Sequence, residues 1–515
     1  MKNKNKVKLL TTATLLTTFL INTGIQSSNQ IENNTAQAAT NKKKTKPSWQ
    51  KPKGKLGKKM GTPPSGKKPS GKPGQKPNGK SGKGGPNTQS YDYKGTLKAS
   101  LNVKSGTTKV GKKTITNNKT DQNVALVQKN GKLSLDGTKL KKTVNSKNDD
   151  SANFYGLDSI LLANGKNAVA TVKNATLTSK ATGANGIFAT NKGTVNVSNT
   201  KIKTTGKANS RGLDATYGGK INANKVKIST KGDHSAAAAT DRGGGTVKNS
   251  KVATKGTGSP LAYSTGTINF NNVTGTASGS QIAGMEGYNK IYLVNSNLTS
   301  TNNKLSGSDP IKNGVIIYQS TSGDAETSSS KSADFQAKDS TLKTAITSGA
   351  MFYVTNTTGK ITLENTKLNF NNSKVDLLNV AGNNSNGWGT KGKNGGHVTL
   401  TAKNQTLKGN IVVDSISSAN VKLTDDSTYT GKTSIVANKY ATSSSKSKMP
   451  LAISVGSNSK WIVTGNSTVT NLNLADGGEI VDSQGNKVTI IANGKTVQKG
   501  TSSYAVTVKG SFTTN

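Results

Sequence analysis

Short runs of alternating apolar and polar residues recur along most of the chain. Two of them are Val195-Asn-Val197 and Ile361-Thr-Leu363. Alternation with a period of two places successive side chains on opposite faces of a β-strand, and no amphipathic helical period competes with it. The pattern therefore predicts an all-β protein whose strands each turn one face inward.

The alternating runs belong to an internal repeat. An apolar anchor is followed two residues later by Asn and five residues later by a second apolar residue, as in Val172-Lys-Asn174-Ala-Thr-Leu177. The unit step is 23 to 26 residues, with longer steps where polar insertions intervene. Short strands repeating at this interval predict a parallel β-helix, in which each coil of chain stacks on the preceding one. The anchors are Leu135, Val172, Val197, Ala223, Val247, Phe270, Leu293, Ala337, Leu363 and Ala402.

The asparagine of the repeat occupies the bend between two strands. A sharp bend needs a residue near the left-handed helical conformation, which Asn tolerates better than other non-glycine residues. Stacked at the strand spacing, these side chains are expected to form a hydrogen-bonded ladder. Gly137 and Asp339 suit the same position, whereas Lys225 does not. The ladder residues are Asn174, Asn199, Asn249, Asn272, Asn295, Asn365 and Asn404.

The repeat also divides the chain into segments. We expect an N-terminal cap at residues 91–122, stacked coils at residues 123–475 and C-terminal capping strands at residues 476–515. Caps are needed because an uncovered coil end exposes unpaired strand edges. A narrow coil needs few inward aliphatic side chains, which explains how a chain with 30% hydrophobic residues can be ordered.

The N-terminal residues are typical of export. Lysines at positions 2, 4, 6 and 8 precede the apolar stretch 9–21, and Ala36-Gln-Ala38 provides a small-x-small cleavage pattern. The apolar stretch is too short for a membrane span and predicts a signal peptide at residues 1–38. The chain contains no Cys, so neither disulfides nor a lipid-modified cysteine are expected. We therefore expect a secreted protein without a transmembrane anchor.

Residues 39–90 are predicted to form a disordered basic linker. Between positions 41 and 90 the chain has 15 Lys, 8 of its 11 Pro and no acidic residue, a composition that cannot bury a core. We expect this tether to bind anionic cell-wall polymers non-covalently through counterion release. The alternative is a solvated spacer without a dedicated partner. The lysines assigned to the tether are Lys42, Lys43, Lys44, Lys51, Lys53, Lys58, Lys59, Lys67 and Lys68.

Charge extends the same expectation to the coils. The net charge is +47, of which residues 91–515 carry +29. A polyanionic neighbour is therefore expected for the coil region as well. Specific nucleic-acid binding is disfavoured by the predicted export and by an aromatic content of only 4%.

The repeat also resembles a known family. The Val-x-Asn-x-x-Leu bends are similar to those of right-handed parallel β-helix proteins of the pectate-lyase-like superfamily. Runs such as 156–163, 210–219 and 350–354 resemble secreted bacterial β-helix proteins described as adhesin-like. The resemblance implies a right-handed single-stranded parallel β-helix and a secreted, cell-surface-associated protein that binds glycans or host or abiotic surfaces. The fold carries many functions, so function must be argued from particular residues.

One group of residues is a candidate saccharide-binding face. Arg211 and Arg242 stand out among the lysines, and the planar guanidinium suits a carboxylate or a sugar acid. The alternative is internal pairing of each Arg with a nearby Asp. Trp388 lies in a Gly- and Asn-rich insertion, where it either stacks on a sugar ring or packs the insertion onto the coil. The candidate ligand-binding residues are Arg211, Asp214, Tyr217, Asp241, Arg242, Tyr263, Glu286 and Trp388.

Catalysis is the rival interpretation. The resemblance implies that enzymes on this scaffold, polysaccharide lyases or glycoside hydrolases, cluster carboxylates on one outer sheet. Here Asp214, Asp241 and Glu286 form only a loose group, and His234 and His397 are too far apart in the repeat for a triad or a metal site. We therefore expect a non-enzymatic protein with no cofactor and no metal.

Overall fold

The computed structural model describes residues 88–321, 325, 331–383 and 387–515, and the structural statements below concern these residues. The predicted signal peptide at residues 1–38 and almost all of the predicted linker, including its nine assigned lysines, lie outside the described residues. Among the described residues, no helix is long and apolar enough to span a membrane.

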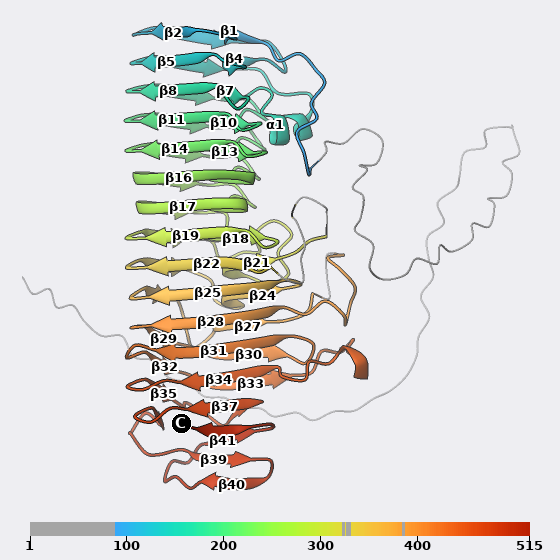
Figure 1. The fold of residues 1–515 in the computed structure, drawn as a ribbon, viewed down its shortest axis with the longest axis vertical. Coiled ribbons are helices and arrows are strands. Elements are labelled where there is room, and N and C mark those ends of the chain that lie inside the picture. Colours follow the sequence, from blue (N-terminus) through green and yellow to red (C-terminus); the bar gives the residue numbers. More distant parts are fainter. Residues whose placement is uncertain (1–87, 322–324, 326–330, 384–386) are drawn as a thin grey trace, which may run out of the picture. The chain divides into compact units, whose positions relative to one another are not determined.

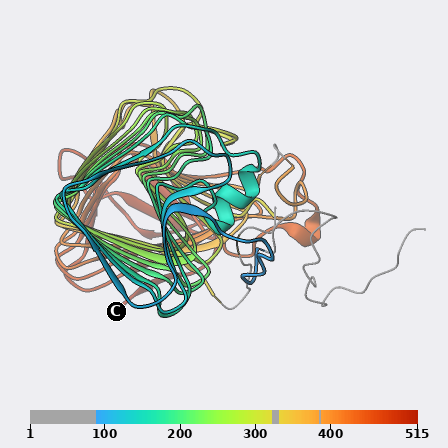
Figure 2. The same ribbon diagram turned by 90° about the horizontal axis from the view of Figure 1, so that it is seen from above.

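The chain from Ala99 onward forms a parallel β-helix (Figure 1). Each coil contributes up to three strands, and equivalent strands stack in three columns, which Figure 2 shows end-on as three sides of the coil. The first column contains β1 (Ala99–Val103), β4 (Asn123–Gln128), β7 (Leu161–Asn164), β10 (Ile187–Thr190), β13 (Leu213–Thr216), β18 (Ala283–Glu286), β21 (Asn313–Tyr318), β24 (Ala350–Thr355), β27 (Asp376–Val380), β30 (Ile411–Asp414) and β33 (Thr433–Val436).

The second column contains β2 (Thr107–Val110), β5 (Lys132–Asp136), β8 (Val169–Lys173), β11 (Thr194–Ser198), β14 (Lys220–Asn224), β19 (Lys290–Val294), β22 (Ala333–Lys338), β25 (Thr358–Glu364), β28 (His397–Lys403), β31 (Ser418–Thr424), β34 (Leu451–Val455), β37 (Asn471–Leu474) and β42 (Phe512–Thr514).

The third column contains β3 (Thr114–Asn117), β6 (Lys139–Lys142), β9 (Thr176–Ser179), β12 (Lys201–Thr204), β15 (Lys227–Thr230), β20 (Asn297–Ser300), β23 (Thr341–Thr344) and β26 (Lys367–Asn369). It continues as a separate sheet of β29 (Thr406–Lys408), β32 (Thr428–Thr430), β35 (Lys460–Ile462) and β38 (Glu479–Val481). Two long strands, β16 (Ala238–Thr254) and β17 (Ala262–Ala277), run through all three columns.

Short elements complete the fold. Helix α1 (Asp149–Tyr155) is capped by Asn148 and lies outside the coils, and a 3-10 turn spans Ser443–Ser445 (Figure 2). At the C-terminal end, β39 (Thr489–Ala492) and β40 (Lys495–Gln498) pair with each other in antiparallel orientation. The other strand pairs of the described residues are parallel. Strand β41 (Ala505–Val508) pairs with both β39 and β36 (Ser467–Val469).

The predicted boundary at residue 123 is wrong. Strands β1, β2 and β3 already pair in parallel with β4, β5 and β6, so the β-helix begins at Ala99 within the range assigned to a cap. The repeat is present there, with Val110 and Ile115 five residues apart. Lys112 occupies its asparagine position, so the motif was not recognised.

The interior is filled by a few aliphatic side chains from each coil. In β11, Val195 and Val197 point inward and are buried, and their register partners in β14 are Ile221 and Ala223. Lys220 and the other even-numbered residues of these two strands turn outward. Burial of one such aliphatic side chain contributes about 1.5–3 kcal/mol, so a chain with modest hydrophobic content can order coil by coil.

The predicted left-handed conformation of the asparagine bends is confirmed. The predicted hydrogen-bonded ladder between their side chains is present only in part. All seven predicted ladder residues have φ between 43° and 53°, in the left-handed region. Asn272 donates from Nδ2 to Oδ1 of Asn249 at 2.8 Å, and Asn249 donates to Asn224 at 2.9 Å. Asn365 and Asn174 instead donate to aspartates of the neighbouring coil. The bends therefore select Asn chiefly for its backbone conformation.

Lys225 provides a test of this explanation, because it holds φ at 54° in the same position. A lysine in the left-handed region is strained by about 1 kcal/mol, and Asn relieves much of that strain. We expect Lys225→Asn to raise the free energy of unfolding by up to about 1 kcal/mol, measured by urea denaturation. The control is Lys220→Asn, an exposed position of β14 whose register partners Thr194 and Gly244 are uncharged, which should be neutral or slightly destabilising. Equal effects of the two substitutions would contradict the explanation.

Candidate functional site

The predicted ligand-binding residues lie at or beside the first column, but the structure gives many of them internal partners. Arg211 precedes β13 and places Nη1 2.8 Å from Oδ2 of Asp214 and 2.9 Å from Oδ1 of Asn153. Burial raises the pKa of Asp214, and the neighbouring guanidinium opposes that shift. This is the internal Arg–Asp pairing that the sequence left open as the alternative to ligand binding.

The second arginine is paired in the same way. Nη1 of Arg242 lies 2.6 Å from Oδ1 of Asp241, and Thr265 donates to the same oxygen at 3.3 Å. Arg242 nevertheless lines a groove of about 630 Å³ with Tyr288 and Lys331 among its walls. It is therefore anchored by Asp241 while part of its side chain faces this groove.

Glu286 belongs to a hydrogen-bonded cluster. It is almost fully buried in β18, accepts a hydrogen bond from the backbone N–H of Ser320 at 3.0 Å and is also contacted by the Ser320 hydroxyl. The Tyr263 hydroxyl donates to Oε2 of Glu286 at 3.1 Å and lies 3.1 Å from the Tyr318 hydroxyl. The carboxylate is thus held by protein groups.

The aromatic candidates Trp388 and Tyr217 are packing residues. Trp388 is 8% exposed and stacks on Tyr318 with ring centroids 4.6 Å apart, so of the two alternatives left open by the sequence the structure shows the packing of the insertion onto the coil. Tyr217 is buried in an aromatic cluster, stacked on Tyr155 of α1 at 5.9 Å and edge-on to Tyr91. Neither contact could be predicted from the repeat, because one member of each pair lies outside the repeat: Tyr155 in α1 and Trp388 in the insertion.

A small pocket brings two of the predicted residues together. Arg211 and Tyr263 share a cavity of about 160 Å³ with His234, Asp309 and Tyr318. Burial raises the pKa of Asp309 to about 7. The volume is below the roughly 300–1,000 Å³ of typical small-molecule sites, so the pocket does not accommodate a sugar chain.

The three predicted carboxylates each have protein partners of their own. Asp214, Asp241 and Glu286 are each bonded to a different set of side chains. In the described part of the chain, no three His, Cys, Asp or Glu side chains gather in a group able to hold a metal ion. Each of these carboxylates is therefore held in place by neighbouring side chains of the protein.

The sequence analysis missed a basic surface on the third column. Lys201, Lys227 and Lys251 lie opposite one another in successive coils. The surface, here called the lysine face, consists of six exposed side chains: Lys139, Lys141, Lys201, Lys203, Lys227 and Lys251. Among the described residues, none of the six forms an ion pair. The signal was present, since Lys139, Lys201, Lys227 and Lys251 each lie four residues after a repeat anchor.

The lysine face carries an electrostatic cost. Lysines directly opposite in adjacent strands are destabilising, and two unit charges about 5 Å apart repel by about 1 kcal/mol even in water. The long side chains can splay to lower this repulsion, but the strand register keeps their Cα atoms aligned. An anion bound along the column removes the repulsion, so the face is suited to a chain of negative charges.

Comparisons with known proteins give no relative from which function could be transferred. No protein-family model matches the chain, and a search of curated proteins finds no match. Its function must therefore be argued from the lysine face and the site geometry alone.

Proposed function

We propose that the protein is a secreted, non-enzymatic β-helix that binds an anionic polymer along the lysine face. The observation that carries the proposal is the in-register row Lys201, Lys227 and Lys251, flanked by Lys203 and without acidic partners among the described residues. Neutralising phosphates, sulfates or carboxylates with such a row releases counterions, which favours binding.

A polymer fits this surface better than a small ligand. The six lysines are exposed on the outer side of stacked strands, whereas small-molecule sites are concave and enclose most of their ligand. Lysine acts as a compact point charge that accepts many anion geometries, so charge spacing along the polymer matters more than its chemical detail. Bases of nucleic acid would need stacking aromatic side chains, and the lysine face contains none.

The proposal also includes the basic linker and the family to which the fold belongs. The basic linker at residues 39–90 would add a second, flexible contact to the same wall polymers, raising the effective affinity of the whole chain. Membership of the adhesin-like group of the pectate-lyase-like superfamily, with binding to glycans or surfaces, is supported by the parallel β-helix and by the bend motif. In this proposal the protein is held at the cell wall without a covalent bond.

The test replaces Lys201, Lys227 and Lys251 by Gln and measures binding of the full chain to immobilised long-chain polyphosphate. We expect affinity to fall at least tenfold, and the slope of log affinity against log salt concentration to fall by about 2 for three lost contacts. The matched control replaces three scattered exposed lysines, Lys109, Lys422 and Lys495, which changes the net charge by the same amount.

Two results would contradict the proposal. Equal losses in both triple variants would show that net charge, not the lysine face, governs binding. Release of unsaturated, ultraviolet-absorbing ends from a uronate polymer would instead support the alternative, an extracellular polysaccharide lyase of the pectate-lyase-like type. A hydrolase would be detected by new reducing ends.

A further inference from the structure

Lys142 occupies an inward position at which the next four coils have Ser or Thr. It ends β6, and the strand register places it opposite Asn117 of β3 on one side and Ser179 of β9 on the other, followed by Thr204 and Thr230. Its side chain is fully buried. Lysine is almost never fully buried unless it is paired, so this residue requires an explanation of its own.

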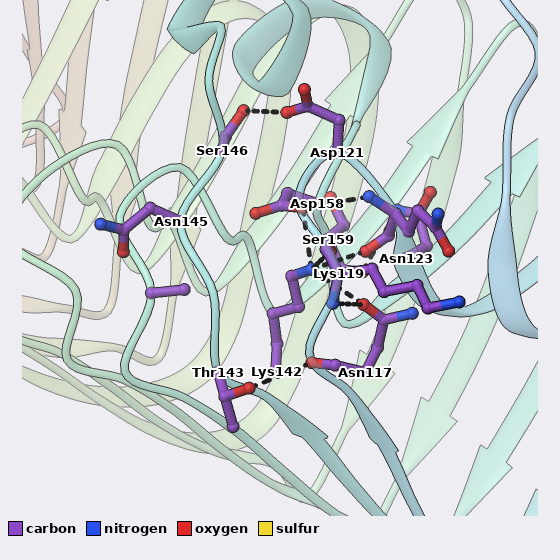
Figure 3. A network of polar contacts seen from close by, with 12 residues as sticks. Asn117, Lys119, Asp121, Asn123, Lys142, Thr143, Asn145, Ser146, Asp158 and Ser159 are labelled. Atoms are coloured by element: carbon purple, nitrogen blue, oxygen red, sulfur yellow. Dashed lines mark hydrogen bonds and ion pairs between the residues drawn. The ribbon is translucent and has the colours of Figure 1, made fainter.

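The Lys142 ammonium nitrogen lies between a carboxylate and an amide (Figure 3). Nζ is 2.8 Å from Oδ1 of Asp158, whose side chain is also fully buried, and donates to Oδ1 of Asn117 at 3.0 Å. The backbone carbonyls of Gln122, at 2.8 Å, and Lys119 accept further hydrogen bonds. These contacts hold Nζ against the Asn117 amide, shielded from solvent.

The Asn117 amide is arranged as an electrophile. Its Oδ1 accepts hydrogen bonds from two donors, Nζ of Lys142 and the backbone N–H of Lys119 at 3.0 Å. Nζ is itself the attacking amine, so the Lys119 N–H is the donor that draws electron density from the carbon and stabilises the negative charge that forms on Oδ1 during the attack. Nδ2 donates to the hydroxyl of Ser100 at 3.0 Å, which fixes the plane of the amide.

Asp158 is placed to accept a proton from the amine. Burial raises the pKa of Asp158 to about 6 and lowers the pKa of Lys142, so both shifts favour the neutral pair. Oδ2 of Asp158 is buried and has no hydrogen-bond partner among the described residues. A proton moved from Nζ to this carboxyl group leaves a neutral, nucleophilic amine beside Asn117.

We propose that Lys142 and Asn117 become joined by an amide bond between Nζ and Cγ. The Nζ lone pair attacks Cγ, and the carbonyl electrons move to Oδ1. Asp158 takes a proton from Nζ and passes one to Nδ2. The Cγ–Nδ2 bond then breaks, the carbonyl reforms and ammonia leaves. No oxidation or reduction occurs, and no co-reactant is needed.

The bond would remove two charges from the interior. A buried ion pair gains little stability because desolvation offsets its attraction, whereas an amide and a protonated carboxyl group are both neutral. It would also join β3 of the first described coil to β6 of the next. Within the described residues, no strand pairs with the outer edge of β3, so the bond would hold the end of the stack where fraying begins.

Peptide mapping of the purified full chain tests the proposal. Trypsin does not cleave after a modified lysine, so we expect peptide 114–119 linked to peptide 142–147, with a combined mass lower than the sum of the two by one ammonia. Fragmentation must place the link on Asn117 and not Asn118. Unlinked peptides of unmodified mass would overturn the proposal. Loss of water with a link between Lys142 and Asp158 would overturn the assignment to Asn117.

Isosteric variants separate the chemistry from folding. Asp158→Asn and Lys142→Met should abolish the link, whereas Lys141→Met, on the outward side of β6, should leave it intact. Asn117→Asp should still link but lose water in place of ammonia, which identifies the leaving group. Circular dichroism shows whether each variant is folded. A folded Asp158→Asn variant that links as fast as the unchanged chain would exclude Asp158 as the proton carrier.

Discussion

Replacing Gly256 by alanine is expected to lower the free energy of unfolding by about 4 kcal/mol or more, among the largest effects of a single substitution. A Cβ atom at Gly256 would lie 1.9 Å from the carbonyl oxygen of Gly232 in the preceding coil. The same close approach recurs at Gly206, Gly232 and Gly279, which form a column of glycines at one corner. The opposing atom is backbone, so relief requires adjacent coils to move apart and break ladder hydrogen bonds.

Gly245 supplies the matched control for Gly256. It is a buried glycine of β16 in the same coil, yet a Cβ atom added there would meet nothing within 4 Å. Gly245→Ala should therefore be neutral or stabilise by up to about 1 kcal/mol, because alanine restricts the unfolded chain. Urea denaturation followed by circular dichroism measures both variants. Equal midpoints for the two would show that the corner can open more easily than the backbone geometry indicates.

The second large effect is expected for Trp461→Ala, which should lower the free energy of unfolding by about 3–5 kcal/mol. Trp461 is fully buried in β35 and stacks on Tyr429 of β32 with ring centroids 5.9 Å apart. Its Nε1–H donates to the backbone carbonyl of Gly431 at 3.0 Å. The two rings fill the interior where the third column continues as a separate sheet, and alanine would leave a cavity between them.

Trp461→Phe distinguishes packing from hydrogen bonding. Phenylalanine keeps much of the ring contact with Tyr429 but leaves the Gly431 carbonyl without its donor, which should cost about 1–3 kcal/mol. Denaturant unfolding monitored by circular dichroism compares Trp461→Ala with Trp461→Phe. If both variants lose the same stability, the hydrogen bond dominates and the cavity argument is incorrect.

The repeat made the coil architecture predictable because it records what every coil shares. The anchor Val197 and the bend residue Asn199 recur in successive coils for geometric reasons, and both positions are found as expected. Four lysines of the lysine face likewise recur in the sequence, four residues after the anchors. The net charge of the chain does not reveal them, because they stand out only when the coils are aligned by repeat position.

Other features could not be read from the repeat because they depend on the insertions. Trp388 is buried by Tyr318 from another coil, and Tyr217 is covered by α1, which belongs to the inserted segment between β6 and β7. Asp158 follows the same inserted segment and reaches Lys142 only because that segment folds back over the first coils. Sequence separation alone does not reveal such contacts. The available signal was a lysine at a position held by Ser or Thr in the next four coils.

The regular register has a consequence for how such a molecule changes over generations. Leu161, Ile187 and Leu213 occupy equivalent positions in three successive coils, and each coil offers its successor the same strand edges that it received. Duplication or loss of one complete unit therefore restores the same pairing at the new junction. The number of coils can therefore change by whole units. The cross-section of each coil and the alignment of its outward charges stay the same.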